Sequence, residues 1–373
     1  MPLEQQIHLS VVVACAMVVV ATAATVRGSR EDRIQQTLIS AAITFGGYAL
    51  VILFGRVYFL RTALAAGILG SLFVSAIIVW LRQQRGGVKV AIIAPLVKSV
   101  PPSLSDAALI ASPAAAINGY DILLVDLHEP LSGEWSRALS RAMLSGTRVR
   151  HVQEYVEEAR GKASIEHFEI EHLPVTEADS YIQVKRLMDI GGAVLLLPVA
   201  LPLIVLSALA ILLTNGWPVF FIQKRVGLGG QPFRMWKLRT MRVANGPNAE
   251  DAALPDDERI TGVGRFLRRC RLDELPQIWN VLKGEMSLIG PRPESVALHT
   301  RYTDAEPKFS YRTLVRPGIT GWAQINAPAS ASVHEALRKL RYDLYYVKKQ
   351  SLSLDVQIGL KTIWVVLRGL GPS

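Results

Sequence analysis

The amino-acid sequence predicts a membrane-associated protein that combines membrane α-helices with a small α/β module and a basic C-terminal domain. Three apolar runs near the N-terminus are each about long enough to cross a bilayer as a helix. Short runs rich in β-branched residues follow, and a fourth apolar run that contains prolines opens the C-terminal half. We therefore expect a transmembrane region of about three helices at 1–87, an α/β module at 88–173, a linker at 174–180 and a C-terminal domain at 181–373.

The basic charge of the chain is concentrated in its C-terminal half. The 373 residues are 50% hydrophobic and carry a net charge of +10, but residues 181–373 hold 26 Lys and Arg against 15 Asp and Glu, a net of +11. Such a surface can bind nucleic acid, an anionic membrane or a phosphorylated substrate. We expect no nucleic-acid partner, because membrane runs are present and no nucleic-acid-binding motif is recognised. Cys15 and Cys270, the only cysteines, predict neither a disulfide framework nor a cysteine metal site.

The first three apolar runs are Leu9–Val26, Thr37–Phe54 and Thr62–Leu81. Arginine and lysine are more frequent after the first and third runs than between the second and third. The positive-inside rule therefore places the N-terminus outside and everything after the third run in the cytoplasm. Ala21-Thr22-Ala23 resembles a signal-peptide cleavage site, but no Lys or Arg precedes it and further spans follow, which favours a retained helix.

Residues 88–173 have the pattern of a small parallel sheet with helices. The runs VKVAIIAP, YDILLVDL and TRVRHV indicate buried strands, and GEWSRALSRAMLSG indicates an amphipathic helix that ends at Gly146. A dinucleotide site would place G-x-G-x-x-G after the first strand, where this chain has AIIAPLVKSVPPS without any glycine. We therefore expect a Rossmann-like module without a dinucleotide, with docking or regulation as its default role.

The fourth apolar run, Ile190–Leu213, carries no charge and is long enough to span a bilayer. Pro198 and Pro202 lie inside it, and proline bends a helix. Basic pairs flank it on both sides, whereas an ordinary span has its cations on one side. A re-entrant helix that bends at proline and leaves by the same face satisfies both observations. The alternative is a kinked ordinary span, which would place the basic C-terminal half outside the cytoplasm.

Two adjacent acids follow three arginines in the stretch RRCRLDELPQIWNVL. Asp273 would be a good N-cap for a predicted helix at Glu274–Leu282, after a break near Arg271. The second interpretation is chemical, because phosphate binds readily at a helix N-terminus among arginines. An aspartate there can attack phosphorus, and a neighbouring carboxylate can hold Mg²⁺. The pattern alone leaves both interpretations open.

Several long motifs carry a resemblance to a known family. KRLMD, the proline-containing apolar run, KLRTM, LDELPQIWNVLKGEMSLIGPRP and RPGITGWAQIN occur in the order seen in bacterial sugar transferases. These are the monotopic phosphoglycosyl transferases that begin exopolysaccharide and O-antigen assembly. The resemblance covers about residues 181–373, and it is strongest to undecaprenyl-phosphate glucose or galactose phosphotransferases. The N-terminal half resembles larger members, which place membrane helices and a Rossmann-like module before the catalytic domain.

The resemblance implies transfer of a sugar-1-phosphate from a nucleotide sugar, such as UDP-glucose or UDP-galactose, to undecaprenyl phosphate in the bilayer, with release of UMP. It implies Asp273 as the nucleophile that forms a covalent sugar-phosphate, Glu274 as a ligand of Mg²⁺, and Arg268 and Arg292 as phosphate-binding residues. The re-entrant bend maps onto Pro202. The expected location is the bacterial inner (cytoplasmic) membrane with the catalytic domain in the cytoplasm, and a homo-oligomer is compatible with the sequence.

Further candidate site residues lie in the other motifs. Lys237 and Arg239 of KLRTM are predicted to bind phosphate or substrate, although a solvated basic hairpin is the alternative. Glu285 is predicted as a second metal ligand or a nearby acid, against a plain surface acid. Arg316 in RPGITG is a candidate phosphate or uridine contact, against a cation in a surface turn.

The sequence departs from the family pattern at two places. Leu201 stands where many members have serine before the proline, and Ala327-Pro328 replaces a common Gly-Arg after GWAQIN. Toward the C-terminus two amphipathic helices are expected, with Tyr345, Tyr346 and Trp364 at a membrane interface or in an ordinary core. A different class of function, a membrane-anchored regulatory protein that binds anionic lipid without catalysis, would need no Asp-Glu pair. A polytopic transferase would need more apolar spans than this chain has.

Overall fold

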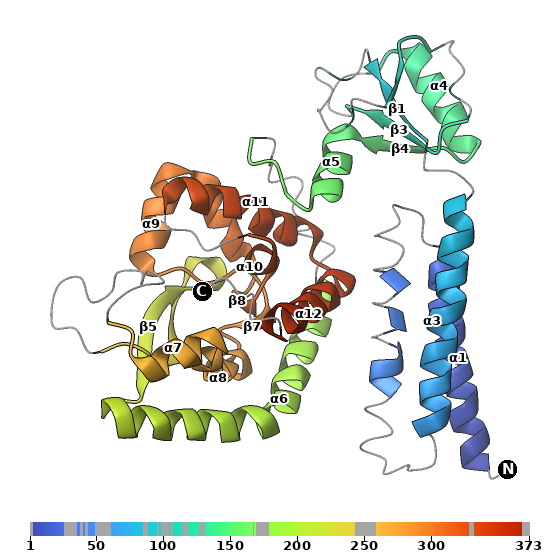
Figure 1. The fold of residues 1–373 in the computed structure, drawn as a ribbon. Helices are drawn as coiled ribbons and strands as arrows, with labels where there is room; N and C mark the ends of the chain where they lie inside the picture. Colours follow the sequence, from blue (N-terminus) through green and yellow to red (C-terminus); the bar gives the residue numbers. More distant parts are fainter. Residues whose placement is uncertain are drawn as a thin grey trace. The chain divides into compact units, whose positions relative to one another are not determined.

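The fold is a mixture of helical and α/β structure that divides into two compact units, Met1–Arg160 and Gly161–Ser373 (Figure 1). The computed structural model describes most of the chain. The described ranges are 3–25, 61–84, 89–94, 107–113, 119–126, 131–166, 179–242, 259–327 and 332–367, together with a few positions at 36–48, 97, 104, 117 and 168.

Two helices of the first unit, α1 (Leu3–Thr25) and α3 (Arg61–Gln84), pack along each other. They correspond to the first and third predicted apolar runs, and their most apolar parts are shorter than a full span. The second predicted run, Thr37–Phe54, lies largely outside the described residues. That these segments cross a membrane remains a prediction, which exposed apolar side chains on both helices support, for example Met17 and Phe73.

The α/β module contains one parallel four-stranded sheet with the order β2-β1-β3-β4. Its strands are β1 (Val90–Ile93), β2 (Ala108–Ile110), β3 (Ile122–Val125) and β4 (Arg148–His151). Helices α4 (Gly133–Leu144) and α5 (Val152–Arg160) accompany the sheet, and Trp135 and Leu139 of α4 join its buried core. The three strands predicted from the sequence are present. Strand β2 was not predicted because it is three residues long and two of them are exposed.

The second unit begins with residues before the predicted boundary at 173. The indole N–H of Trp322 donates to the carbonyl of Gly161 at 2.7 Å, and Phe168 is buried in a cluster with Phe309 and Leu340. The compact units therefore divide earlier along the chain than the sequence pattern indicated, because these contacts hold residues 161–168 on the C-terminal unit.

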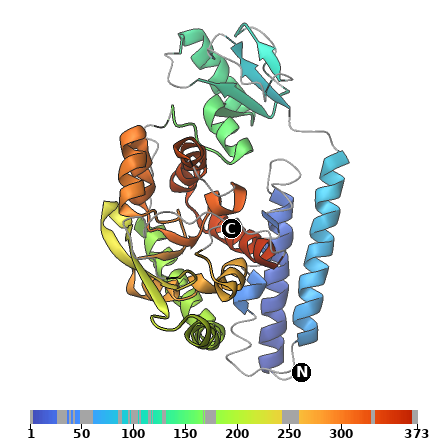
Figure 2. The ribbon, with the colours of Figure 1, turned by 60° about the vertical axis from the view of Figure 1, so that its left-hand side comes forward.

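Helix α6 (Asp179–Asn215) carries the fourth apolar run, and both prolines lie near its middle. Figures 1 and 2 show that the helix turns sharply partway along its length, so its two arms run in different directions. Only 17% of its most apolar stretch is buried. Most of its leucine and valine side chains are exposed, Leu206 and Leu213 among them, and they suit lipid rather than water. This is the one described helix that is long and apolar enough to cross a membrane.

Three charged side chains fasten the first arm of α6 to the rest of the second unit. The Lys185 ammonium lies 2.6 Å from the Asp355 carboxylate. The Arg186 guanidinium donates to the carbonyls of Val281 and Leu282, at 2.6 and 2.9 Å. The Asp189 carboxylate accepts from the hydroxyl of Ser287 and from the backbone N–H that follows it, both at 2.9 Å. These anchors fix where the apolar arm leaves the domain, and therefore how the domain would sit on a bilayer.

Replacing both prolines of α6 by alanine is expected to straighten the helix and invert part of the population, because proline lacks the N–H that completes the helical ladder. Single cysteines near Ser180 and near Gly230, in a chain without Cys15 and Cys270, should both resist an impermeant thiol reagent in intact cells. In the Pro198→Ala, Pro202→Ala variant the site near Gly230 should become labelled. Labelling of that site alone in the parent would contradict the re-entrant model.

The remaining elements of the second unit surround a small mixed core. Strands β5 (Phe220–Val226) and β6 (Pro232–Leu238) form the antiparallel hairpin expected from the three glycines between them. Strands β7 (Ser287–Ile289) and β8 (Gly318–Thr320) pair in parallel. The helices are α7 (Gly262–Arg269), α8 (Gln277–Lys283), α9 (Val296–Ala305), α10 (Trp322–Asn326), α11 (Val333–Lys349) and α12 (Leu352–Leu367), with 3₁₀ turns η6 (Leu272–Glu274) and η7 (Pro307–Leu314).

The two predicted C-terminal helices are α11 and α12, but one of their aromatic residues does not lie at a membrane interface. Tyr346 is 1% exposed, and its hydroxyl donates to the Asp355 carboxylate at 2.8 Å. Tyr345 lies near Trp322 with ring centroids 6.0 Å apart. Trp364 is half exposed and is still available to an interface. Packing against Ile358 and Leu354 explains why Tyr346 belongs to the core.

Candidate functional site

The adjacent acids lie on a tight turn between α7 and α8. Thr261 caps α7 by accepting from the N–H of Gly264, and the helix ends at Arg269 with Cys270 as its C-cap. Arg271 then adopts a left-handed conformation with φ +56°, which costs energy for a residue with a side chain and is common at functional sites. The turn η6 follows at once. The break predicted near Arg271 is therefore present, and it leaves Asp273 and Glu274 buried, with exposed fractions of 8% and 7%.

Glu274 is the centre of a cluster of cations. Its Oε1 accepts from the Arg292 guanidinium at 2.8 Å and from the Lys237 ammonium at 3.4 Å, and Arg271 Nε lies 4.0 Å from Oε2. Burial alone would raise the pKa of Glu274, but Arg292, Lys237 and Arg271 outweigh burial and hold this pKa far below its ordinary value. Glu274 is thus ionised throughout the physiological range. Its Oε2 is buried and accepts no hydrogen bond.

The pKa of Asp273 is shifted in the opposite direction to that of Glu274. Burial and the neighbouring charge of Glu274 raise the pKa of Asp273 to about 6, and the cations Lys237, Arg268 and Arg292 only partly oppose this shift. Loss of water on burial therefore outweighs the nearby cations in setting this pKa. Asp273 is mostly ionised at pH 7, yet it is more basic than an ordinary aspartate. Two carboxylates in one site with divergent pKa values indicate two different roles.

The alternative that Asp273 caps a helix is not supported. The helix α8 begins later than predicted, with Pro276 at its N-cap position and no side-chain hydrogen bond there. Pro276 cannot donate a backbone N–H, and the acids occupy the separate turn η6. With seven residues, α8 is also too short for its N-terminus to serve by itself as a phosphate site. The side chains around Asp273 must supply the positive charge.

Four of the predicted site residues come together with Asp273. These are Glu274, Lys237, Arg268 and Arg292, and each appears among the charges that shift the pKa of Asp273. Arg268 is oriented by Thr240, whose hydroxyl accepts from its Nε at 2.8 Å. Arg292 is one-third exposed at the side chain, so its guanidinium can reach a ligand while it holds Glu274. Burial lowers the pKa of Lys237 to about 8.

Three other predicted residues have structural partners elsewhere. Arg239 is buried and donates to the carbonyls of Asn215 and Gly216, at 2.6 and 2.7 Å, so it caps the C-terminal end of α6. Arg316 Nε donates to the carbonyl of Gly284 at 3.1 Å. Glu285 Oε2 accepts from Asn280 at 2.6 Å. Gly284 and Glu285 follow α8, whereas the acid pair precedes it.

The length of α8 therefore separates Glu285 from the acid pair. Among the described residues no group of three acids, histidines or cysteines comes together that could hold a metal. The prediction of Glu285 as a metal ligand beside Glu274 finds no support in this geometry.

Sequence reasoning missed two residues that shape the site. Asn280 is fully buried on α8, where it accepts from the N–H of Trp236 at 3.1 Å and donates to the carbonyl of Arg234 at 2.7 Å. It joins the acid-bearing segment to β6. An asparagine inside the apolar run IWNVL was the signal for it. Arg225 donates to the carbonyl of Pro293 at 3.1 Å, and burial lowers its pKa to about 10.

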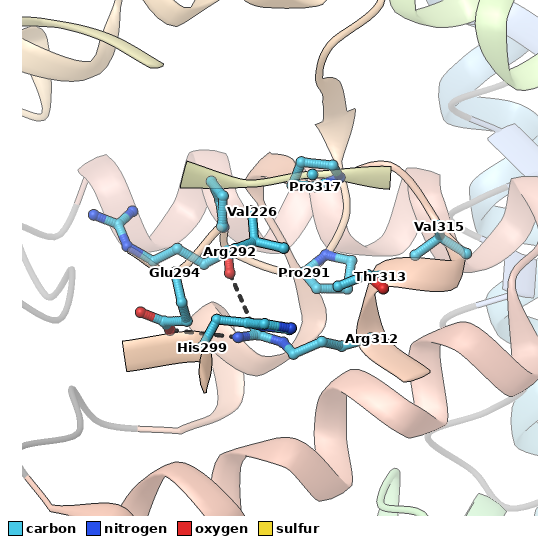
Figure 3. A pocket seen from close by; sticks show the side chains of 11 residues that line it. Val226, Pro291, Arg292, Glu294, His299, Arg312, Thr313, Val315 and Pro317 are labelled. Atoms are coloured by element: carbon cyan, nitrogen blue, oxygen red, sulfur yellow. Dashed lines mark hydrogen bonds and ion pairs between the residues drawn. The ribbon is translucent and has the colours of Figure 1, made fainter. Parts of the chain in front are cut away.

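A pocket lies beside the loop that carries Arg292 (Figure 3). Its wall is formed by the end of β5, the loop after β7, α9 and η7. The lining residues are Val226, Gly227, Pro291, Arg292, Pro293, Glu294, His299, Arg312, Thr313, Val315 and Pro317. The pocket thus adjoins the acid pair through Arg292, whose guanidinium donates to Glu274.

The fold and the site together define a domain with one long, exposed apolar helix, in which a buried carboxylate with a raised pKa lies beside a strongly ionised one within a cationic cluster. A sequence model of the family described as bacterial sugar transferase matches residues 180–369, about half of the chain. The chain belongs to the bacterial sugar transferase family.

Curated relatives agree with this assignment. The chain is 41% identical over 254 residues to the UDP-N-acetylgalactosamine-undecaprenyl-phosphate N-acetylgalactosaminephosphotransferase of Aeromonas hydrophila, which covers 68% of this chain and 60% of that protein. It is 42% identical over 182 residues to the UDP-glucose:undecaprenyl-phosphate glucose-1-phosphate transferase of Caulobacter vibrioides, covering 48% of this chain and 68% of that protein. The protein of the same description from Escherichia coli is 40% identical over 182 residues, 48% of this chain and 39% of that protein. The chain thus spans 60% of the length of the Aeromonas hydrophila relative and 39% of the length of the Escherichia coli relative, both less than two thirds.

Proposed function

We propose that this protein is a phosphoglycosyl transferase that moves a sugar-1-phosphate from a UDP-sugar to undecaprenyl phosphate and releases UMP, in the first membrane step of polysaccharide synthesis. The observation that carries the proposal is the buried pair Asp273 and Glu274 among Lys237, Arg268 and Arg292. The relatives are named for this class of reaction, with glucose or N-acetylgalactosamine as the sugar. A regulatory protein that only binds lipid would have no use for two buried acids in one cationic cluster.

In the first step of the proposed reaction, a carboxylate oxygen of Asp273 attacks the phosphorus that carries the sugar. The bond between that phosphorus and the bridging oxygen of UMP breaks, so UMP leaves with both electrons of the bond. Raised basicity makes Asp273 a better nucleophile than an ordinary aspartate, while at pH 7 it is still mostly ionised. Arg268, Arg292 and Lys237 would spread the negative charge that develops on the phosphate oxygens.

In the second step an oxygen of the lipid phosphate attacks the same phosphorus, and the bond to the Asp273 oxygen breaks. The carboxylate is restored, and the lipid diphosphate-sugar departs. Division into two steps separates two anions, UMP and the lipid phosphate, that would otherwise meet in one site. Because a diphosphate linkage is exchanged for another, the protein has mainly to stabilise charge rather than to supply a driving force.

The donor groups around Glu274 fit a divalent cation. Its Oε2 is buried without a hydrogen bond, and the Asp273 carboxylate is adjacent in the chain. Mg²⁺ in proteins is commonly held by one or two carboxylates together with substrate phosphates and water. Glu274, with help from Asp273, would hold it here. When bound, Mg²⁺ would offset the charge of the donor diphosphate.

The proposed location is the bacterial inner (cytoplasmic) membrane, with the site on the cytoplasmic side where nucleotide sugars are found. The exposed apolar surface of α6 supports insertion into lipid, and the basic charge of residues 181–373 favours the cytoplasmic face. An undecaprenyl phosphate in the bilayer would then reach Asp273 from the membrane side.

The function is tested by incubating membranes that contain the protein with UDP-sugars labelled in the sugar. UDP-glucose, UDP-galactose and UDP-N-acetylgalactosamine would each be supplied, followed by extraction of lipid. We expect one of them to give a labelled lipid that mild acid releases as a sugar phosphate or diphosphate. The absence of lipid-linked product from every nucleotide sugar, with protein shown to be folded, would contradict the proposal.

The rate of UMP release without lipid acceptor is expected to follow a bell-shaped pH profile. Release should rise with pH as Asp273 loses its proton near pH 6, and it should fall as Lys237 loses its proton near pH 8. The diphosphate of a UDP-sugar does not titrate in this range, so both limbs report the protein. In Lys237→Arg the alkaline limb should vanish, because a guanidinium stays protonated. An unchanged alkaline limb in that variant would assign it to another group.

A further inference from the structure

The loop that carries Arg292 has no regular structure of its own. It follows β7 and includes Pro291 and Pro293, so two of its residues lack a backbone N–H to donate. On one side, the N–H of Val226 at the end of β5 donates to the carbonyl of Glu294 at 3.0 Å, and Arg225 donates to Pro293. The position of the Arg292 side chain over Glu274 therefore depends on what holds this loop from its other side.

Besides the N–H of Gly318, which donates to the carbonyl of Pro291 at 2.9 Å, that other support is Arg312 on η7. Its Nη2 donates to the backbone carbonyl of Arg292 at 2.7 Å, and its Nη1 lies 3.5 Å from the Glu294 carboxylate (Figure 3). The same guanidinium lies 2.8 Å from the Asp343 carboxylate on α11. One planar group thus joins three acceptors from two segments, the loop 291–294 and α11. Arg312 contacts the backbone of the loop, and it is only 6% exposed, so it is not itself displayed to a substrate.

The Arg312 guanidinium is fixed in its place. Asp343 is 2% exposed, and the ring of Phe309 lies 4.8 Å from the guanidinium carbon. Arg312 and Arg225 also hold the pKa of Glu294 below its ordinary value, although burial acts in the opposite direction. A buried ion pair seldom adds much net stability compared with apolar residues of the same volume. Its directional hydrogen bonds, in contrast, can fix a geometry that apolar packing would leave loose.

We propose that Arg312, anchored by Asp343, is a positioning residue of the transfer reaction: it holds residues 291–294 so that Arg292 stays on Glu274 and faces the donor phosphates. This inference rests on the proposed function for the reaction that it assists. It assigns to η7 and α11, which carry none of the reacting groups, a part in orienting the phosphate-binding arginine. Displacement of such a group by about 1 Å can cost about a hundredfold in rate.

The test compares variants that remove the support without leaving a buried charge unpaired. Arg312→Met combined with Asp343→Leu replaces the pair by apolar side chains of similar size, which is often tolerated by the fold. Arg312→Lys keeps the charge but loses the planar fork. Arg338→Gln is the matched control, because Arg338 lies on the same helix as Asp343, with a side chain 64% exposed in a surface ion pair. Thermal unfolding verifies that each variant is folded.

We expect UMP exchange into UDP-sugar to fall about 10- to 100-fold in the double variant, to fall less in Arg312→Lys, and to stay at the parent rate in Arg338→Gln. The decisive comparison adds Arg292→Gln. If Arg312 acts through Arg292, the Arg292→Gln variant and the triple variant will exchange at the same rate. Losses that multiply instead would mean that Arg312 acts by another route, and the proposal would be overturned.

A second readout needs no substrate and separates this inference from the proposed function. Hydrogen–deuterium exchange of the peptide that contains Val226 should be faster in the double variant than in the parent, because the partner carbonyl of Glu294 is then no longer held. It should be unchanged in Arg338→Gln. Unaltered protection of Val226 would overturn the positioning role even if UMP exchange fell. If the parent incorporated labelled UMP into none of the nucleotide sugars supplied, the proposed function would fail. The protection of Val226 would still decide the role of Arg312.

Discussion

Replacing Asp273 by asparagine is expected to abolish the exchange of labelled UMP into UDP-sugar, measured with Mg²⁺ and without lipid acceptor. An amide is a far poorer nucleophile than a carboxylate, so the covalent step should not occur. Among the described residues no second carboxylate lies in an equivalent position, since Glu274 is held in its ionised form by Arg292, Lys237 and Arg271. We expect a loss of at least about four orders of magnitude, as for other nucleophiles removed from covalent catalysts.

The same variant should be more stable than the parent at neutral pH. The folded-state pKa of Asp273 is raised to about 6, above its ordinary value, so ionisation of Asp273 costs stability as the pH rises through 6. Asparagine avoids that cost, which amounts to roughly 1 to 3 kcal/mol for a shift of this size. If Asp273 were a helix cap, the variant would instead lose about 1 kcal/mol or less and would keep its exchange activity. Thermal unfolding at pH 5 and pH 8 distinguishes the two outcomes.

Glu274→Gln is expected to reduce both activity and stability. The folded-state pKa of Glu274 is lowered, so its charge stabilises the fold above the ordinary carboxyl pKa, and glutamine forfeits this at neutral pH. The guanidinium of Arg292 and the ammonium of Lys237 would then lack their common anion. Removing one partner of a buried pair typically costs about 3 kcal/mol, and loss of orientation at a charge-stabilising group typically costs about a hundredfold or more in rate.

Asp304→Asn is the control for Glu274→Gln, because Asp304 is an exposed acid on α9. It should leave the unfolding temperature and UMP exchange unchanged. A Glu274→Gln protein that unfolds at the parent temperature and exchanges UMP at the parent rate would show that the cationic cluster does not depend on this carboxylate. In Glu274→Gln the pKa of Lys237 should fall further, because the charge of Glu274 favours the protonated amine.

Local patterns were sufficient to predict most of the elements. Short runs rich in β-branched residues identified β1, β3 and β4, and glycines at 227, 229 and 230 identified the hairpin turn, where Gly229 and Gly230 have positive φ. The break near Arg271 was also predicted, and it is present as the left-handed residue between α7 and η6. Strand β2 was missed because it is short and largely exposed, so it has no hydrophobic signature of its own.

Part of the site was predictable from the motifs, whereas tertiary contacts decide the roles of the other candidate residues. Asp273, Glu274, Lys237, Arg268 and Arg292 come together as expected. Arg239 and Arg316 are similar to them in sequence, yet their guanidinium groups donate to main-chain carbonyls at the ends of α6 and α8. A basic residue in a motif can bind an anionic ligand or cap the C-terminal end of a helix, and only the fold distinguishes these two roles. The sign of the Asp273 pKa shift was likewise decided by burial, which a list of neighbouring charges does not reveal.

The covalent intermediate on Asp273 is the central claim, and peptide mass spectrometry tests it most directly. The protein would be mixed with a UDP-sugar and Mg²⁺ without lipid acceptor, quenched rapidly in acid and digested. The account predicts that the peptide containing Asp273 gains the mass of one sugar phosphate, that an equal amount of UMP is released, and that Asp273→Asn shows neither. A sugar phosphate found on another residue, or UMP turnover with the Asp273 peptide unmodified at every time sampled, would contradict it.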